Sequence, residues 1–310
     1  MIYTCTIAPS IDYTAYLPEF ESGTLNRSEE VYYYPGGKGI NVSRVLSRLG
    51  LKSRALGYAG GFTGRYIEEF LASEGIETDF IASENITRIN VKIKSSKETE
   101  LNGPGPELEP SQLGQLKDKV AAMAAGDWFV LAGSLPASVP TQFFKELAAD
   151  CHERGIHFVL DTSGPALEAL LDTKPFLIKP NEHELGEMFG VDITSQQQAF
   201  HYASQLVEKG VEHVVVSMGG SGAIYVSQNH RYQAQAPKGK AVNTVGSGDS
   251  LVSGFIASYI QHQDPKRAFQ YGVASGSATA FRSDLCELAD VERLLPDVSV
   301  SPFEEKDVTQ

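Results

Sequence analysis

The sequence predicts an α/β fold in three layers, in which helices cover both faces of a mainly parallel central sheet and a small β-sheet lies over one end. Short apolar runs alternate along the chain with longer stretches whose apolar residues recur every three or four positions. The apolar runs are residues 128–131, 156–160, 176–178 and 214–216. Because these runs are apolar throughout, they are expected to be strands buried on both faces, as in a parallel sheet.

The stretches between the strands are expected to be helices. Residues 111–125 and 140–154 have apolar side chains at helical spacing, and each stretch stops next to a glycine. The chain has 310 residues, which exceeds the usual ~100–200 residues of a domain, but α/β folds often form one unit of ~250 residues or more. We therefore predict a single domain over residues 1–310.

Two early segments break this alternation. Residues 87–94 alternate strictly between apolar and polar side chains, and the chain then turns back, which is the pattern of a β-hairpin with one face in water. Residues 12–34, which are rich in Tyr and acidic side chains, are expected to add strands to the same sheet. The segments 12–34 and 87–102 are thus predicted to form a lid over a site. A β-extension without such a role is the alternative.

The composition excludes several classes of function. A formal charge of −13 disfavours nucleic acid and anionic membranes as partners, because both are normally bound through basic patches. No apolar run approaches the ~20 residues needed to cross a bilayer, and the first residues lack the pattern of a secretory signal, so a cytoplasmic protein is expected. The three cysteines, Cys5, Cys151 and Cys286, are far apart and are expected to be reduced.

The strongest local motif is a glycine-rich turn at residues 243–250, which leads into a predicted helix at residues 251–260. Such a turn directs unpaired backbone N–H groups one way and adds the positive end of a helix dipole, which suits a phosphate or a phosphoryl group in transfer. The residues whose backbone would form this cradle are Gly246, Ser247 and Gly248.

Asp249 follows this cradle directly. A carboxylate there would repel a phosphate, unless its role is to accept a proton from the attacking group. The spacing fits a catalytic base and an ordinary helix cap equally well. The turn is neither a P-loop nor a dinucleotide-binding fingerprint, because the chain lacks G-x-x-x-x-G-K-[ST] and the third glycine of G-x-G-x-x-G.

A second glycine-rich turn, at residues 35–43, also leads into a predicted helix. Lys38 is a single positive charge among three glycines, Gly36, Gly37 and Gly39, which would let a ligand contact backbone. Asn41 offers donors and acceptors that suit sugar hydroxyls. Taken alone, this turn is weak evidence of a binding site.

Together the two turns resemble the signatures of the PfkB, or ribokinase-like, family of carbohydrate kinases. The signatures correspond to Gly36-Gly-Lys-Gly-Ile-Asn41 and Thr244-Val-Gly-Ser-Gly-Asp249, in the same order and at a similar separation. Further matching stretches are Thr6-Ile-Ala-Pro-Ser-Ile-Asp12, Asn26-Arg27, Ala132-Gly-Ser-Leu-Pro136, Lys179-Pro-Asn-Glu-His-Glu184 and Ser217-Met-Gly-Gly-Ser-Gly222. The resemblance implies a three-layer ribokinase-like sandwich with a β-sheet lid.

The resemblance implies that Asp249 is the base, with the N–H groups of Gly246 to Asp249 as an anion hole. It implies that Asn181 and Glu184 hold Mg²⁺ and its waters near the phosphates of ATP. A loop in which Asn181 only caps a helix is the alternative. The residues expected to bind ATP are Lys179, Asn181, Ser217, Gly219, Gly220, Gly222 and Gly248.

The resemblance also implies a sugar site in the first third of the chain. Asp12 would hold sugar hydroxyls, with Gly37 and Asn41 beside it. Three cations, Arg27, Lys38 and Arg88, would surround a phosphate already present on the sugar. A solvated surface charge is the alternative for each cation taken singly.

The resemblance, within the phosphosugar kinases of the family, implies transfer of the γ-phosphoryl group of ATP to fructose 1-phosphate, which makes fructose 1,6-bisphosphate. Tagatose 6-phosphate is the alternative substrate, since Ser247 is the residue that its kinases favour in the loop. A sugar-phosphate sensor without catalysis is the alternative from another class. Asn243 replaces an Asp linked to a monovalent-cation site in many family members, so a requirement for potassium stays open. A homodimer through the lid is one assembly that the family uses.

Overall fold

A computed structural model of the chain describes residues 1–304. Its larger sheet has 11 strands, of which ten run in the order β15-β14-β13-β12-β11-β10-β9-β1-β4-β5 while β6 pairs with β4. The strands are β1 (Ile2–Thr6), β4 (Ser53–Ala59), β5 (Glu77–Thr78), β6 (Ile81–Ala82), β9 (Trp128–Ala132), β10 (His157–Asp161), β11 (Leu177–Ile178), β12 (His213–Ser217), β13 (Ala223–Ser227), β14 (Arg231–Ala234) and β15 (Val300–Pro302). The predicted mainly parallel sheet is confirmed, because antiparallel pairing within the described residues of this larger sheet occurs only from β12 to β15.

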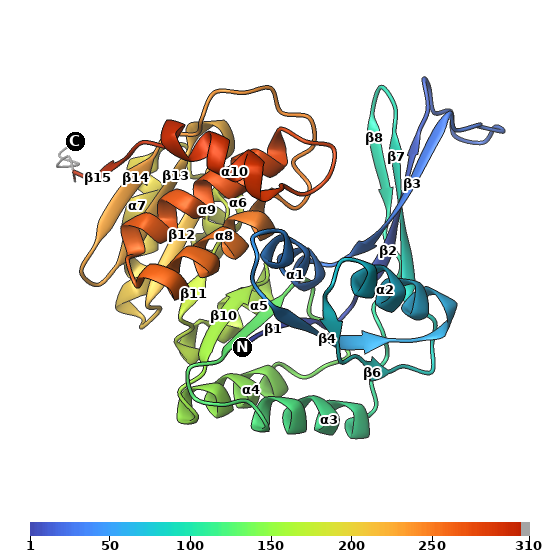
Figure 1. Cartoon of the computed structure of the whole chain (residues 1–310), viewed down its shortest axis with the longest axis horizontal. Coiled ribbons are helices and arrows are strands. Elements are labelled where there is room, and N and C mark those ends of the chain that lie inside the picture. The colour runs from blue at the N-terminus through green and yellow to red at the C-terminus, as the bar shows by residue number, and fades with distance from the viewer. Residues whose placement is uncertain (305–310) are drawn as a thin grey trace.

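Helices cover both faces of this sheet, so the predicted three layers are confirmed (Figure 1). One face is covered by α1 (Lys38–Arg48), α8 (Ser247–His262), α9 (Pro265–Ala280) and α10 (Leu288–Leu294), with α2 (Gly61–Ser73) beside α1. The other face is covered by α3 (Pro110–Ala121), α4 (Thr141–Glu153), α5 (Pro165–Leu170), α6 (Glu182–Phe189) and α7 (Gln196–Glu208). None of the helices in residues 1–304 is both long and apolar enough to span a bilayer.

The central strands are apolar throughout because both faces of the sheet are covered by the core. All five residues of β9 are buried, and alternate side chains pack into the two helical layers: Phe129 and Leu131 on one side, Trp128 and Val130 on the other. Short 3₁₀ turns complete the body at Leu171–Thr173, Gly219–Ser221 and Leu295–Asp297.

A second, four-stranded sheet stands out from the body as a long ribbon (Figure 1). Its strands, in the order β3-β2-β7-β8, are β2 (Ser10–Tyr16), β3 (Glu30–Gly36), β7 (Arg88–Lys94) and β8 (Glu98–Leu101). Both early segments that break the βα alternation therefore supply its strands. Strands β2 and β7 are parallel neighbours, with Ser10 opposite Arg88 and Asp12 opposite Asn90, so the side chains of these four residues share one face.

Candidate active site

A cavity of about 1010 Å³ lies where the carboxyl ends of the parallel strands meet the small sheet and the first turns of α1 and α8. Side chains that follow β10, β11 and β12 line it, as do Asp12 and Arg88 from the small sheet. The carboxyl edge of an open α/β sheet is where such folds bind ligands. The cavity gathers every residue that the sequence predicts for the site except Arg27. Arg27 is exposed in the connection between β2 and β3.

The first turn of α8 needs its glycines for two different reasons. Gly246 has φ 79°, in the left-handed region, and a Cβ there would lie 2.5 Å from a Leu285 side-chain carbon. A Cβ on Gly248 would lie 2.9 Å from the Lys179 ammonium. Ser247 N–H donates to the Thr244 carbonyl at 3.2 Å, whereas the N–H groups of Gly248 and Asp249 lie in the first helical turn and have no intrahelical acceptor. The donors open to an anion are therefore those of Gly248 and Asp249.

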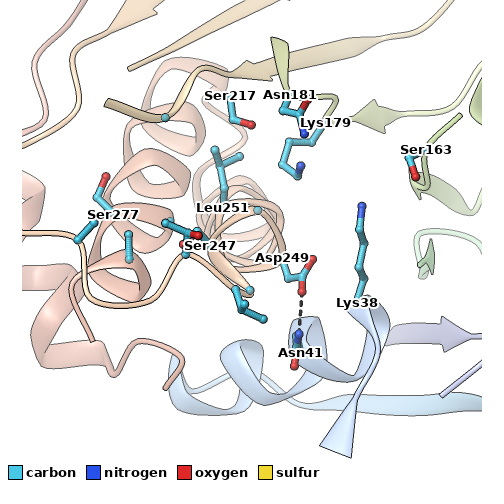
Figure 2. A pocket seen from close by; sticks show the side chains of 18 of the residues that line it. Lys38, Asn41, Ser163, Lys179, Asn181, Ser217, Ser247, Asp249, Leu251 and Ser277 are labelled. Atoms are coloured by element: carbon cyan, nitrogen blue, oxygen red, sulfur yellow. Dashed lines mark hydrogen bonds between the residues drawn. The ribbon is translucent and has the colours of Figure 1, made fainter. Parts of the chain in front are cut away.

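Asp249 is not the cap of α8, because Gly246 occupies the N-cap position. Asp249 is 6 % exposed, and its Oδ2 accepts a hydrogen bond of 2.8 Å from Asn41 Nδ2 on α1 (Figure 2). Burial and the nearby charge of Asp161 raise the pKa of Asp249 to about 6, against the opposing effects of Lys38, Asn41 and Lys179. A carboxyl with that pKa is ionised at pH 7 and is still a useful proton acceptor.

Lys38 and Lys179 approach the space in front of Asp249 from different elements (Figure 2). Lys38 is the first residue of α1, and Lys179 follows β11. Both are paired with Asp161, the last residue of β10, whose Oδ1 lies 3.1 Å from Lys38 Nζ and 3.8 Å from Lys179 Nζ. Sequence reasoning missed Asp161, because it is one acidic residue at the end of an apolar strand and its partners are remote in sequence.

Asn181 and Glu184 form a reciprocal capping box at the start of α6. Asn181 Oδ1 accepts from Glu184 N–H at 2.8 Å, and Glu184 Oε2 accepts from Asn181 N–H at 2.9 Å. Both residues also line the cavity. They can therefore cap α6 and belong to the candidate site at the same time. Within residues 1–304, no three His, Cys, Asp or Glu side chains gather as a metal cage. A cation here would need phosphate oxygens and waters as its other ligands, as Mg²⁺ commonly does.

One end of the cavity is built mostly from backbone and small side chains. Ser217 ends β12, and the 3₁₀ turn Gly219–Ser221 follows it. Gly222 has φ 91°, and a Cβ there would lie 2.0 Å from the Ala234 carbonyl oxygen. Ser277 of α9 lies at this end of the cavity (Figure 2). The connection at residues 236–241 also lines it, and neither carries a local sequence motif that would have predicted it.

The other end is built from the small sheet. Asp12 accepts hydrogen bonds from Ser10 Oγ at 2.8 Å and Asn90 Nδ2 at 3.1 Å, and it pairs with Lys92 Nζ at 3.0 Å. Sequence reasoning missed Asn90 and Lys92. The sequence did contain a signal for these two residues, since positions 88, 90 and 92 of an alternating strand share one face.

Three further residues hold the shape of this end. The Arg88 guanidinium donates to the carbonyls of Ala8 at 2.9 Å and Gly103 at 3.0 Å, and its buried Nε has no hydrogen-bond partner among the described residues. Gly36 has no room for a side chain, because a Cβ would lie 2.3 Å from Asp12 Oδ1. Gly37 has φ 121°, a conformation that L side chains rarely adopt, and it is the N-cap residue just before α1.

Comparison with known proteins agrees with this geometry. The family model described as "pfkB family carbohydrate kinase" matches residues 3–290. The chain belongs to the pfkB family of carbohydrate kinases. ATP is therefore the co-substrate that its cavity is expected to receive, and the resemblance seen in the two glycine turns is confirmed.

Individual pfkB relatives match over nearly the whole chain. The 1-phosphofructokinase of Bacillus subtilis is 48% identical, over 97% of this chain and 99% of that protein. The D-tagatose-1-phosphate kinase of Bacillus licheniformis is 35% identical, over 97% of this chain and 99% of that protein. A crystal structure of Escherichia coli phosphofructokinase-2 in complex with fructose-6-phosphate superposes with a TM-score of 0.89 and 30% identity, covering 95% of this chain and 98% of that one. The pfkB fold therefore extends through both sheets.

Proposed function

We propose that the protein transfers the γ-phosphoryl group of ATP to the C6 hydroxyl of fructose 1-phosphate and so makes fructose 1,6-bisphosphate. The observation that carries this proposal is the position of Asp249, a buried carboxylate on a helix whose first turn also offers N–H donors. The 48% identity to a protein named 1-phosphofructokinase supports the choice of substrate. Since ATP and sugar phosphates are found together in the cytoplasm, we propose that the protein works there.

In this mechanism the sugar lies against the small sheet, with its hydroxyls on Asp12 and its phosphate near Arg88 and Lys38. The Asp12 carboxylate is held by three donors, so its orientation is set before the sugar binds. The acceptor hydroxyl then lies between Asp12 and Asp249. Asp249 takes the hydroxyl proton as the oxygen attacks the γ-phosphorus.

The charge that develops on the transferred phosphoryl group is stabilised by fixed groups. The N–H groups of Gly248 and Asp249 and the dipole of α8 face it, with Lys38 and Lys179 on either side. Ser217, Gly219, Gly220 and Gly222 would hold the nucleotide at the far end of the cavity. Asn181 and Glu184 would hold a Mg²⁺ ion, whose chemistry there would be to neutralise phosphate charge.

The small sheet has an apolar face turned away from the cavity, through which we propose that two copies of the chain associate. Its exposed side chains are Val31, Tyr33, Ile89 and Leu101, which the strand pairing places on one face. Light scattering after size exclusion should report a dimer, and Leu101→Lys should shift it toward monomer. A wild-type monomer at micromolar concentration would contradict the assembly.

A coupled kinase assay with purified protein, ATP and Mg²⁺ tests the function. Fructose 1-phosphate, tagatose 6-phosphate, tagatose 1-phosphate and fructose 6-phosphate are compared by kcat/KM, and fructose 1-phosphate is expected to give the highest value. Tagatose 6-phosphate is included because of Ser247, and tagatose 1-phosphate because of the 35% identical relative. A higher kcat/KM for another of these sugars would make that sugar the preferred substrate, and the protein would still be a sugar-phosphate kinase. No phosphoryl transfer to any of them, with sugar binding intact, indicates a sensor.

A further inference from the structure

Asp161 is a buried carboxylate just behind the wall of the cavity, and the proposed mechanism gives it no role. Its side chain is 1 % exposed, and it is not one of the residues that line the cavity. Oδ1 faces both Lys38 and Lys179, while Oδ2 is buried and has no hydrogen-bond partner among residues 1–304. A buried carboxylate with one unsatisfied oxygen is unfavourable for folding alone, which suggests that it serves the site.

The two lysines belong to opposite ends of the cavity. Lys38 begins α1, next to the sugar end, and lies 123 residues from Asp161 in sequence. Lys179 comes before α6, next to the nucleotide end, and its ammonium occupies the space beside Gly248. A lysine side chain has four rotatable carbon–carbon bonds, so its ammonium needs a fixed counter-ion to hold one position. Asp161 is fixed by the backbone of β10 in the middle of the central sheet.

We propose that Asp161 is a positioning residue that holds Lys38 and Lys179 on the two sides of the phosphoryl-transfer path and sets the charge around Asp249. The proposal rests on the assignment of Asp249 as the base. Asp161 does not contact substrate in this proposal. It acts on the sugar end through Lys38 and on the first turn of α8 through Lys179.

The charges of the neighbouring elements support this role. The ionisable groups that face this cluster are Lys38 from α1, Lys179 after β11, Asp249 from α8 and Glu184 from α6. Burial alone would raise the pKa of Asp161, but Lys179 and Lys38 hold it below its usual value, so Asp161 stays ionised. Its charge in turn raises the pKa of Asp249, while the two lysines lower it.

The test is Asp161→Asn, which keeps the shape of the side chain and removes its charge. Both lysines then lose their counter-ion, and kcat is expected to fall about 10- to 100-fold, as misplacement of groups around a reacting centre commonly causes. The KM values for ATP and for the sugar phosphate should both rise. The acid limb of the kcat profile should move by about one unit to lower pH, because a negative charge near Asp249 is gone while two positive charges remain.

A purely structural ion pair predicts a different result. In that case Asp161→Asn lowers the melting temperature but leaves the acid limb where it is in the wild type, and that outcome overturns the proposal. The matched control is Asp172→Asn, which removes an exposed carboxylate paired with Lys145 and should leave kcat and the pH profile unchanged. A double-mutant cycle with Lys38→Met should be strongly non-additive in kcat, and additive losses also count against the proposal.

Asp161→Glu keeps the test decisive if the Asn variant does not fold. It retains the charge but moves it by one methylene, so the acid limb should stay near its wild-type position while kcat falls. An Asp161→Glu enzyme with wild-type kcat contradicts the positioning role. These comparisons need only an active wild-type enzyme, so a wild type without kinase activity refutes the proposed function and not the role of Asp161 specifically.

Discussion

The two ends of the cavity are built in different ways. The phosphoryl end, by which we mean the nucleotide end together with the first turn of α8, is made from glycine turns and strand ends of the packed α/β body. Asp249 and Lys179 are each 6 % exposed there. The sugar end is made from side chains on a four-stranded ribbon whose other face reaches 62 % exposure at Leu101. Rigid backbone suits a transition state whose charge is the same for every sugar, whereas side chains on a thin sheet can adapt to a particular substrate. Changes at the first end should therefore affect kcat, and changes at the second should affect KM.

Asp249→Asn should give the largest effect and sharpen this contrast most. The amide keeps the size of the side chain but cannot accept the hydroxyl proton, so kcat should fall by about 10² to 10⁴-fold. Calorimetric affinities for ATP and the sugar phosphate should stay within a few-fold of the wild type. Near-normal turnover in this variant would remove Asp249 as the base.

Gly248→Ala should give the next largest effect at the same end. The new Cβ would lie 2.9 Å from Lys179 Nζ, so the ammonium must move away from the transfer path. We expect kcat to fall about 10- to 100-fold, with little change in melting temperature, because the clash is with the end of a flexible side chain. Gly114→Ala in α3 is the control, since a Cβ there meets nothing within 4 Å. Equal activities for the two variants would contradict the tight packing proposed for this turn.

The contrast between the two ends also explains what sequence could predict. The central strands and the glycine turns were predictable because each is a local pattern, and Asp249 stood next to one of them. Whether it caps the helix could not be decided locally, because that depends on α8 beginning after Gly246 as its N-cap. The contact that holds its side chain comes from Asn41, 208 residues away, and its role as base stays a prediction. Asp161 was missed for the same reason, since its role depends on the order of strands in the sheet.

The sugar end was less predictable because it depends on strand register. Asn90 and Lys92 reach Asp12 only because β2 and β7 are parallel neighbours with Asp12 opposite Asn90. Arg27 was expected near the sugar phosphate, but it lies exposed in the connection between β2 and β3, away from the cavity of this single chain. Its role as a phosphate ligand stays a prediction.

Arg88→Ala tests the sugar end. The guanidinium lies in the cavity wall with a free buried Nε, so its loss should raise the KM for the sugar phosphate about 10-fold or more, as for other charge-assisted phosphate contacts. The kcat and the KM for ATP should change much less. Arg54→Ala removes a partly exposed arginine paired with Glu77 and serves as the control. An unchanged KM for the sugar phosphate would place Arg88 outside the phosphate pocket.

The smallest expected effect is in the acid limb of the pH profile of kcat, and it again concerns the phosphoryl end. Asp249 must be ionised to accept a proton, and its pKa is raised to about 6, first by burial and then by the charge of Asp161. Activity should therefore be nearly full at pH 7 and fall about tenfold for each unit below pH 6. The sugar phosphate itself titrates near pH ~6, so the measurement is kcat at saturating substrate rather than kcat/KM. A limb centred near pH 4 would mean that the buried carboxylate is not the titrating base, and the phosphoryl end would then owe its rate to charge and position alone.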